Sequence, residues 1–310
     1  MLKTHEQPLP NQSTGVANTV SWTTKTVLQL GRVSSLPTIL STTLAGAAVA
    51  GGNPLNPNIV ILMFAMSLAY IGGAFLNDAF DRKFDKEHHP ERPISKGTIK
   101  AAEVFAAGFT LLAASVMFSG LGAMSWGHNV AIVILLTIAL TITIVLYDIW
   151  HKDNPLSPAI MGLCRFLLIL IAGFAAADKP SVVLYFGAAA MLCYLIGLTW
   201  AARQENFDNI KNLWPLLFLL IPVAYGLVRS LSDFQVLPLL LLLTACTLYA
   251  TVLLKRKQQS NTTQAKAFMI AGIALVDALL ISTSSSLFIA AIAVTAFLLT
   301  LTLQHYLADT

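Results

Sequence analysis

The chain has 310 residues, of which 56% are hydrophobic and only 11% are charged, and its formal net charge is +4. A soluble domain carries about 25% charged residues, so this composition excludes an ordinary soluble domain and indicates a polytopic membrane protein. No basic stripe with interleaved aromatic residues is present, so we expect no nucleic-acid partner. The cysteines, Cys164, Cys193 and Cys246, fall inside apolar runs and are interpreted as packing residues.

The polar residues 1–28 are predicted to form an N-terminal tail, ahead of a single transmembrane domain, 29–310. A spanning helix needs about 20 mostly apolar residues. Apolar segments of about this length are 33–50, 58–78, 101–120, 129–147, 158–176, 182–201, 213–229, 235–254, 267–283 and 286–304. Because only Ser284 and Ser285 separate the last two, they form either a tight hairpin or a span followed by a shorter terminal helix.

Lysine and arginine concentrate in alternate connections between these segments. The basic connections are 79–100, 148–157, 202–212 and 255–266, whereas the connections between them hold only Lys179 and Arg229. Basic loops are enriched on the cytoplasmic side of membranes. We therefore expect the N-terminus and the basic loops to be cytoplasmic.

The most informative stretch runs from the end of the second segment into the first of these loops: Asn77 to Asp85, which reads N-D-A-F-D-R-K-F-D. Asp78, Asp81 and Asp85 are spaced i, i+3 and i+7, so on a continuing helix they share one face. Crowded carboxylates repel unless a cation joins them, and Mg²⁺ binds through a few carboxylates plus substrate phosphates. Basic residues that would face an anion follow: Arg82, Lys83, Lys86, Arg92 and Lys96. The alternative interpretation is a solvated, salt-bridged loop.

Two later loops carry further candidates. Between the fourth and fifth segments, Lys152 is a candidate phosphate ligand, and His151 is expected to be a solvated loop histidine. After the sixth segment, Glu205 and Asp208 form a smaller carboxylate pair flanked by Arg203. Because this pair lies four spans after the first motif, the two loops are predicted to share one cavity mouth.

Two ionisable residues lie inside predicted spans, where such residues usually face the bundle interior or a wet cavity. Arg165 lies about two turns from the cytoplasmic end of its span, near enough to contact an anionic ligand. Asp277 lies deep in its span and is expected to act mainly as a hydrogen-bond partner between helices.

The motif N-D-x-x-D-x-x-x-D continues into Arg92-Pro93-Ile94-Ser95-Lys96-Gly97, an R-P-I-x-x-G sequence. Together these residues resemble the UbiA superfamily of intramembrane prenyltransferases. The similarity extends over Tyr147 to Arg165, and the helix layout agrees from about residue 30 to 283. Leu146-Tyr147-Asp148, Met161 to Arg165 and Ala202 to Glu205 are most similar to the EboC-like branch.

The resemblance implies an all-α membrane bundle of nine helices, or ten with the last segment, around a central cavity in which Mg²⁺ and an isoprenyl diphosphate bind. The implied catalytic residues are Asn77, Asp78, Asp81 and Asp85, and the implied metal ligands are Asp78, Asp81, Asp85 and Asp208. The implied substrate-binding residues are Lys83, Arg92, Lys152, Arg165, Arg203, Glu205 and Asp208. The second motif of the family is usually D-x-x-x-D, whereas Glu205 and Asp208 lie one residue closer together.

The function implied is Mg²⁺-dependent transfer of a prenyl group to an acceptor, expected to be aromatic, inside a bacterial inner membrane with the site loops in the cytoplasm. Candidate general bases are Glu205, Asp208 and Asp148. The alternative function is that of a transporter, or of a non-catalytic carrier of a prenyl lipid or pathway precursor, which would bind without releasing pyrophosphate.

Overall fold

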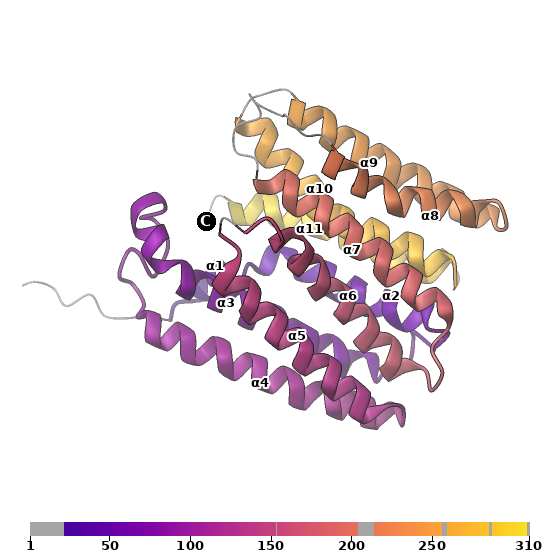
Figure 1. Ribbon diagram of the computed structural model, residues 1–310, viewed down its shortest axis with the longest axis horizontal. Helices are drawn as coiled ribbons and strands as arrows, with labels where there is room; N and C mark the ends of the chain where they lie inside the picture. The colour runs from indigo at the N-terminus through magenta and orange to yellow at the C-terminus, as the bar shows by residue number, and fades with distance from the viewer. Residues whose placement is uncertain (1–21, 153, 204–213, 256–258, 285–286, 309–310) are drawn as a thin grey trace, which may run out of the picture.

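The computed structural model describes residues 22–152, 154–203, 214–255, 259–284 and 287–308. Within these ranges every regular element is a helix, as the sequence predicts (Figure 1). The helices are α1 (Thr24–Leu30), η1 (Val33–Ser35), α2 (Leu36–Val49), α3 (Ile59–His88), α4 (Ala101–Trp126), α5 (Val130–Trp150), α6 (Ser157–Ala176), α7 (Val182–Arg203), η3 (Trp214–Leu220), α8 (Ile221–Ser230), η4 (Phe234–Val236), α9 (Leu237–Lys255), α10 (Gln259–Ser282) and α11 (Leu287–Ala308). Helix α1 begins inside the predicted tail, most of which lies outside the described residues.

In the described part of the chain, eight helices are long and apolar enough to cross a membrane. They correspond to eight of the predicted segments. The other two predicted segments form shorter apolar helices, Val33–Val49 and Leu216–Ser230. The predicted polytopic helical bundle is confirmed, whereas the count of nine or ten spans stays a prediction.

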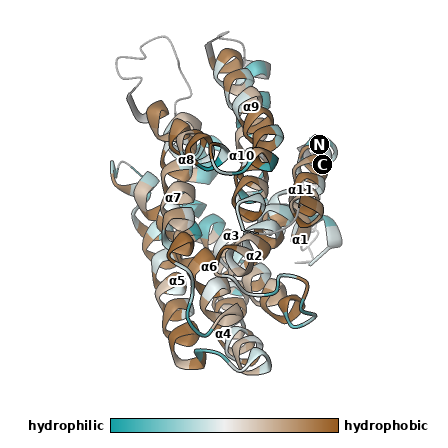
Figure 2. Cartoon of the chain, turned by 90° about the vertical axis from the view of Figure 1, so that its right-hand side faces the viewer, coloured by the Kyte–Doolittle hydropathy of each residue, from teal (hydrophilic) through white to brown (hydrophobic). Residues whose placement is uncertain are grey.

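Helices α2, α6 and α10 occupy the middle of the bundle. Almost every residue of α2 is buried, and the apolar windows of α6 and α10 are 61% and 78% buried. The corresponding windows of α5 and α11 are only 22% and 28% buried. Figure 2 shows that the outer helices are mainly hydrophobic along their length, as expected of helices whose outer surface faces lipid.

Glycines allow α3 and α4 to approach each other closely. A Cβ on Gly72 would lie 2.9 Å from the carbonyl oxygen of Gly108, and a Cβ on Gly108 would lie 2.7 Å from Cγ of Leu76. Both distances are shorter than real Cβ contacts allow, so side chains at these positions would force the helices apart. This close packing fixes the position of α3 just before the aspartate motif.

Helix α3 continues well past the predicted end of its span. Its 30 residues make it about 45 Å long, compared with about 30 Å for the hydrocarbon core of a bilayer. Asp78, Asp81 and Asp85 therefore lie on its last turns, and the loop that was predicted to begin at residue 79 begins only after His88. Hydropathy identifies the apolar part of a helix, and the charged turns that follow give no such signal.

Asp277 joins α10 to α2 in the middle of the bundle. Its Oδ2 accepts hydrogen bonds from Ser41 Oγ at 2.6 Å and from Thr42 Oγ1 at 2.9 Å. Asp277 is completely buried. The prediction that it acts as a hydrogen-bond partner between helices is confirmed.

The predicted orientation can be tested with cysteines at the two ends of α3. Glu87, near its carboxyl end, is exposed, and Leu55, before its amino end, is 55% exposed. In intact cells, an impermeant thiol reagent should label Leu55→Cys and should not label Glu87→Cys until the membrane is permeabilised. The parent protein, whose three cysteines are retained, gives the background. The reverse labelling pattern would contradict a cytoplasmic aspartate motif.

Candidate active site at the carboxyl end of α3

The aspartates of α3 point inward despite their charge. The side chains of Asp78, Asp81 and Asp85 are only 9%, 11% and 3% exposed. Burying a carboxylate is costly unless a charged or hydrogen-bonding partner compensates it. The partners of these aspartates come from three separate parts of the chain.

The segment after α3 turns back and brings Arg92 onto two of the aspartates. Arg92 Nη1 lies 2.7 Å from Asp85 Oδ2 and 3.5 Å from Asp78 Oδ1. Gly97 closes this turn with φ = +77°, a conformation that favours glycine. The R-P-I-x-x-G sequence therefore has a physical reason, because it places an arginine beside the aspartates and supplies the glycine that the turn requires.

Arg32 is a site residue that sequence reasoning missed. Its Nη2 donates hydrogen bonds to Asn77 Oδ1 at 2.6 Å and Asp78 Oδ1 at 2.9 Å. Arg32 connects α1 to η1 with φ = +44°, a left-handed conformation that is uncommon for residues other than glycine. No motif surrounds Arg32, and the only available signal was a single basic residue just before the first apolar segment.

Asp81 pairs with the loop between α5 and α6. Its Oδ1 lies 2.8 Å from Lys152 Nζ, and its Oδ2 lies 3.3 Å from His151 Nε2. The Lys152 ammonium also lies 3.8 Å from the centre of the Phe84 ring, a favourable cation–π contact. The prediction that His151 is a solvated histidine is wrong, because His151 lies at the end of α5 and contacts Asp81.

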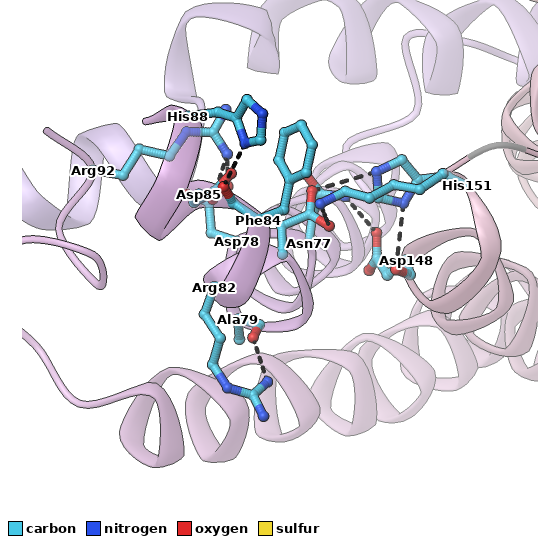
Figure 3. Close-up of polar contacts among 12 residues, drawn as sticks. Asn77, Asp78, Ala79, Arg82, Phe84, Asp85, His88, Arg92, Asp148 and His151 are labelled. Atoms are coloured by element: carbon cyan, nitrogen blue, oxygen red, sulfur yellow. Dashed lines mark hydrogen bonds and ion pairs between the residues drawn. The ribbon is translucent and has the colours of Figure 1, made fainter. Parts of the chain in front are cut away.

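Figure 3 shows that Arg92 reaches the aspartates on one side of α3, while His151 lies on the other side near Asp148. The repulsion predicted among the three aspartates is therefore relieved by the basic side chains of the chain itself. Within the described residues, no group of three His, Cys, Asp or Glu side chains is gathered as a metal site. The atoms of the motif that could bind a metal are nevertheless oxygens, from the aspartate carboxylates and the Asn77 amide, and Mg²⁺ prefers oxygen ligands.

A cavity of about 380 Å³ opens beneath this cluster. Arg32, Asn77 and Asp148 line its polar part, while Met66, Leu140 and other apolar side chains line the remainder. Asn77 Nδ2 donates a hydrogen bond to Asp148 Oδ1 at 3.1 Å. Asp148 Oδ2 is buried and has no hydrogen-bond partner among the described residues. Asp148 thus lines the cavity and carries one buried carboxylate oxygen that no described residue pairs.

The remaining basic residues that the sequence predicted for the site, as far as the structure describes them, do not pair with the aspartates. Arg165 lines the cavity, whereas Lys83 is exposed and forms no ion pair with the aspartates in the described part of the chain. Arg82 also points away from them, because its Nη1 donates to the carbonyl of Ala79 and its guanidinium lies over Phe105. Glu205, Asp208 and the side chain of Arg203 lie outside the described residues, but Ala202, near the end of α7, lines the cavity.

Residues 39–269 match the model of the UbiA prenyltransferase family, which is more than half of the chain. The chain belongs to this family. The match covers α3, the aspartates and most of the residues that line the cavity, and it ends within α10. The multiple apolar helices and the family together establish an integral membrane protein. Assignment to the EboC-like branch stays a prediction.

Similar proteins include the digeranylgeranylglyceryl phosphate synthase of Natronomonas pharaonis, which is 28% identical over 61% of this chain. The protoheme IX farnesyltransferase of Aquifex aeolicus is 29% identical, also over 61% of this chain. The matches span 65% and 64% of those proteins, slightly under two thirds of their length. A solved structure described as concerning digeranylgeranylglyceryl phosphate synthase in membranes has a TM-score of 0.58 and 20% identity, and the match covers 84% of this chain and 98% of that one. That likeness concerns the fold.

The pairing of His151 with Asp81 leads to a prediction about pH. The hydrogen bond that the His151 ring donates to the Asp81 carboxylate raises the pKa of His151, and this effect outweighs the opposing effect of burial. A histidine with a raised pKa stabilises the fold at pH values below its unfolded pKa of about 6.5, and this contribution is lost as pH rises through the folded pKa. NMR titration of labelled histidine in metal-free protein should give a value above 6.5 for His151, and Asp81→Asn should lower it. An unchanged value in Asp81→Asn would contradict the pairing.

Proposed function

We propose that this protein transfers a prenyl group from an isoprenyl diphosphate to an acceptor inside the membrane, in a reaction that requires Mg²⁺. The observation that carries the proposal is that the cluster of aspartates and basic side chains adjoins an apolar cavity, since Asp78 pairs with Arg32, which lines that cavity. Such a cavity suits a molecule with a diphosphate head and a long hydrocarbon tail. The names of the similar proteins support prenyl transfer as the reaction class.

Asp78, Asp81 and Asp85 are the residues that would hold Mg²⁺, together with Asp208 as the resemblance implies. When bound, the metal neutralises negative charge that develops on the leaving diphosphate. Asn77 contacts both Arg32 and Asp148, so it positions these side chains relative to the motif. The aspartates are already adjacent to groups that favour negative charge, which is the environment that a diphosphate also needs.

Arg32, Arg92 and Lys152 are the proposed diphosphate ligands. Each now contacts a carboxylate oxygen, and arginine in particular matches the geometry of phosphate as well as that of carboxylate. If the aspartates hold the metal, these basic side chains would be available to contact phosphate oxygens. Lys83 and Arg203 remain further candidates.

The cavity then protects the reaction from water. Loss of diphosphate leaves positive charge on the allylic carbon, which water would quench. The lining is mainly apolar, and Tyr70 and Tyr147 also line it. Aromatic rings of this kind stabilise nearby cations. The acceptor attacks the allylic carbon within this space, and an aromatic acceptor is the one we expect.

Asp148 is the proposed general base. Of the three candidates, it is the one within the described residues, it lines the cavity, and its Oδ2 has no hydrogen-bond partner among those residues. Asn77 holds the other carboxylate oxygen. In this role Asp148 takes the proton that the acceptor loses, while pyrophosphate carries away the electron pair of the broken carbon–oxygen bond. Glu205 and Asp208 stay alternatives.

Two isosteric variants separate binding from turnover. Asp81→Asn keeps the shape of the side chain but removes the charge that would hold the metal, so Mg²⁺-dependent affinity for farnesyl or geranylgeranyl diphosphate should fall tenfold or more, about 1.4 kcal/mol. Asp148→Asn should retain most of this affinity but lose most of its turnover. The measurements are diphosphate binding with and without Mg²⁺ and pyrophosphate release with candidate acceptors.

Lys179→Gln, in a loop on the opposite side of the predicted membrane, is the matched control and should change neither quantity. If Asp81→Asn binds the prenyl diphosphate as tightly as wild-type protein, and Mg²⁺ makes no difference to that affinity, the proposal of a metal site is wrong. Wild-type protein that binds prenyl diphosphates in Mg²⁺ but releases no pyrophosphate with any acceptor would favour the carrier alternative.

Gly97 provides a second test through the turn that carries Arg92. Gly97→Ala forces alanine into a left-handed conformation at a cost of about 1–2 kcal/mol, so the turn should loosen and Mg²⁺-dependent diphosphate affinity should decrease severalfold. Gly51→Ala is a matched control, because Gly51 has φ = +86° and, like Gly97, has open space around its Cβ position. Equal effects of the two variants on diphosphate affinity would exclude a specific role for the Gly97 turn.

A further inference from the structure

Arg165 is a buried cation that the proposed diphosphate site does not use. It lies about two turns into α6, lines the cavity, and is 8% exposed. The proposed diphosphate ligands lie at the cytoplasmic ends of helices or in loops, whereas Arg165 lies within a span. A guanidinium group in this position requires an explanation, because charged groups inside a membrane protein are costly unless they are compensated.

The hydrogen bonds of Arg165 leave part of its guanidinium unused. Nη1 donates to the Thr38 carbonyl at 2.9 Å and to Thr42 Oγ1 at 2.8 Å, and Nη2 donates to Thr38 Oγ1 at 2.7 Å. All three acceptors belong to α2. Nε and the second hydrogen of Nη2 make no hydrogen bond within the described part of the chain. Unused donors on a buried cation beside a cavity can be satisfied by a ligand.

The charge of Arg165 is also only indirectly compensated. Thr42 connects Arg165 to Asp277, accepting from Nη1 at 2.8 Å and donating to Asp277 Oδ2 at 2.9 Å. No carboxylate of the described residues lies within 4.0 Å of the Arg165 guanidinium. Asp277 Oδ1 is buried without a hydrogen-bond partner among those residues. A hydroxyl group thus separates two opposite charges that would otherwise pair.

This arrangement has a consequence for the proposed reaction. Prenyl transfer places positive charge on the allylic carbon inside the cavity that Arg165 lines. Two positive charges in an apolar cavity repel strongly, so a guanidinium that is only indirectly compensated would oppose the reaction. An anion bound between them would convert this repulsion into attraction.

We propose that Arg165 forms an anion subsite for the acceptor, which therefore carries a carboxylate or phosphate group. This inference rests on the proposed prenyl transfer and specifies the class of its acceptor. Nε and Nη2 of Arg165 hold the anionic oxygens, so the nucleophilic part of the acceptor extends toward Asp148 at the cytoplasmic part of the cavity. The subsite is separate from the diphosphate site, whose basic residues lie beside the aspartates of α3.

The competing explanation is that Arg165 only joins α6 to α2 and α10. Two variants distinguish these roles. Arg165→Gln removes the positive charge, whereas Asp277→Asn removes the negative charge but can still accept from Ser41 and Thr42. If Arg165 binds an anion, removing the nearby negative charge should preserve or strengthen that binding. If the network is only structural, both variants should act through stability alone.

The test uses purified protein in neutral detergent without prenyl diphosphate or Mg²⁺. The probes are matched pairs: 4-alkylbenzoate against 4-alkylbenzyl alcohol, and lysophosphatidate against monoacylglycerol. Calorimetry measures the affinity for each probe, and a thermal melt checks the fold of each variant. The first pair tests a carboxylate and the second tests a phosphate, so the arms identify which anion the subsite accepts.

We expect wild-type protein to bind at least one anionic probe about tenfold or more tightly than its neutral partner, as charge-assisted hydrogen bonds provide. Arg165→Gln should abolish this preference, Arg165→Lys should retain part of it, and Asp277→Asn should equal or exceed wild type. Arg229→Gln is the control for nonspecific attraction, because Arg229 bonds to the Thr283 carbonyl away from the cavity and should leave the preference unchanged.

The proposal is overturned if wild-type protein shows no preference for either anion, or if Asp277→Asn loses it as completely as Arg165→Gln. The preference for an anionic probe over its neutral partner is measured first on wild-type protein alone. The proposal can therefore still be tested if Arg165→Gln does not fold. Prenyl diphosphate binding in Mg²⁺ is measured separately. Its failure would reject the proposed function, whereas failure of the anion assay alone would reject only the acceptor subsite.

Discussion

The burial of negative charge at the end of α3 is the constraint on which the site depends. Carboxylates can be buried there only if positive groups compensate them. The chain satisfies this requirement from three directions, with Arg32 before η1, Arg92 after α3, and Lys152 after α5. The positive φ angles of Arg32 and Gly97 belong to the turns that bring Arg32 and Arg92 to the aspartates. The aspartates thereby determine the conformation of segments that are distant in sequence.

Much of this arrangement follows from the sequence. Hydropathy locates the apolar segments because each membrane helix must satisfy its backbone hydrogen bonds internally. The spacing of Asp78, Asp81 and Asp85 predicts that they share one helix face, and the sequence that follows supplies Arg92 among the basic residues expected to face an anion. These predictions depend on local periodicity or on a short motif, both of which one sequence contains.

The residues that were missed depend on contacts between distant segments. Arg32 reaches Asn77 only because its backbone turns sharply between two helices. His151 reaches Asp81 because α5 ends beside α3, and neither residue carries a sequence signal of that meeting. The final turns of α3 were assigned to a loop because their charges conceal the helix from hydropathy. The second carboxylate pair, Glu205 and Asp208, lies outside the described residues and stays a prediction.

The hydrogen bond between Ser41 and Asp277 gives α11 a role, although α11 lies beyond the nine helices that the resemblance implies. Ser41 and Asp277 form a polar contact inside the bundle, and Ser41 also lines a groove whose other wall includes Ile292 and Leu299 of α11. If that wall were lipid, a polar group would approach the hydrocarbon region from which polar groups are normally excluded. α11 packs against both α2 and α10. It therefore separates the Ser41–Asp277 contact from lipid and helps to preserve the charge distribution on which Arg165 depends.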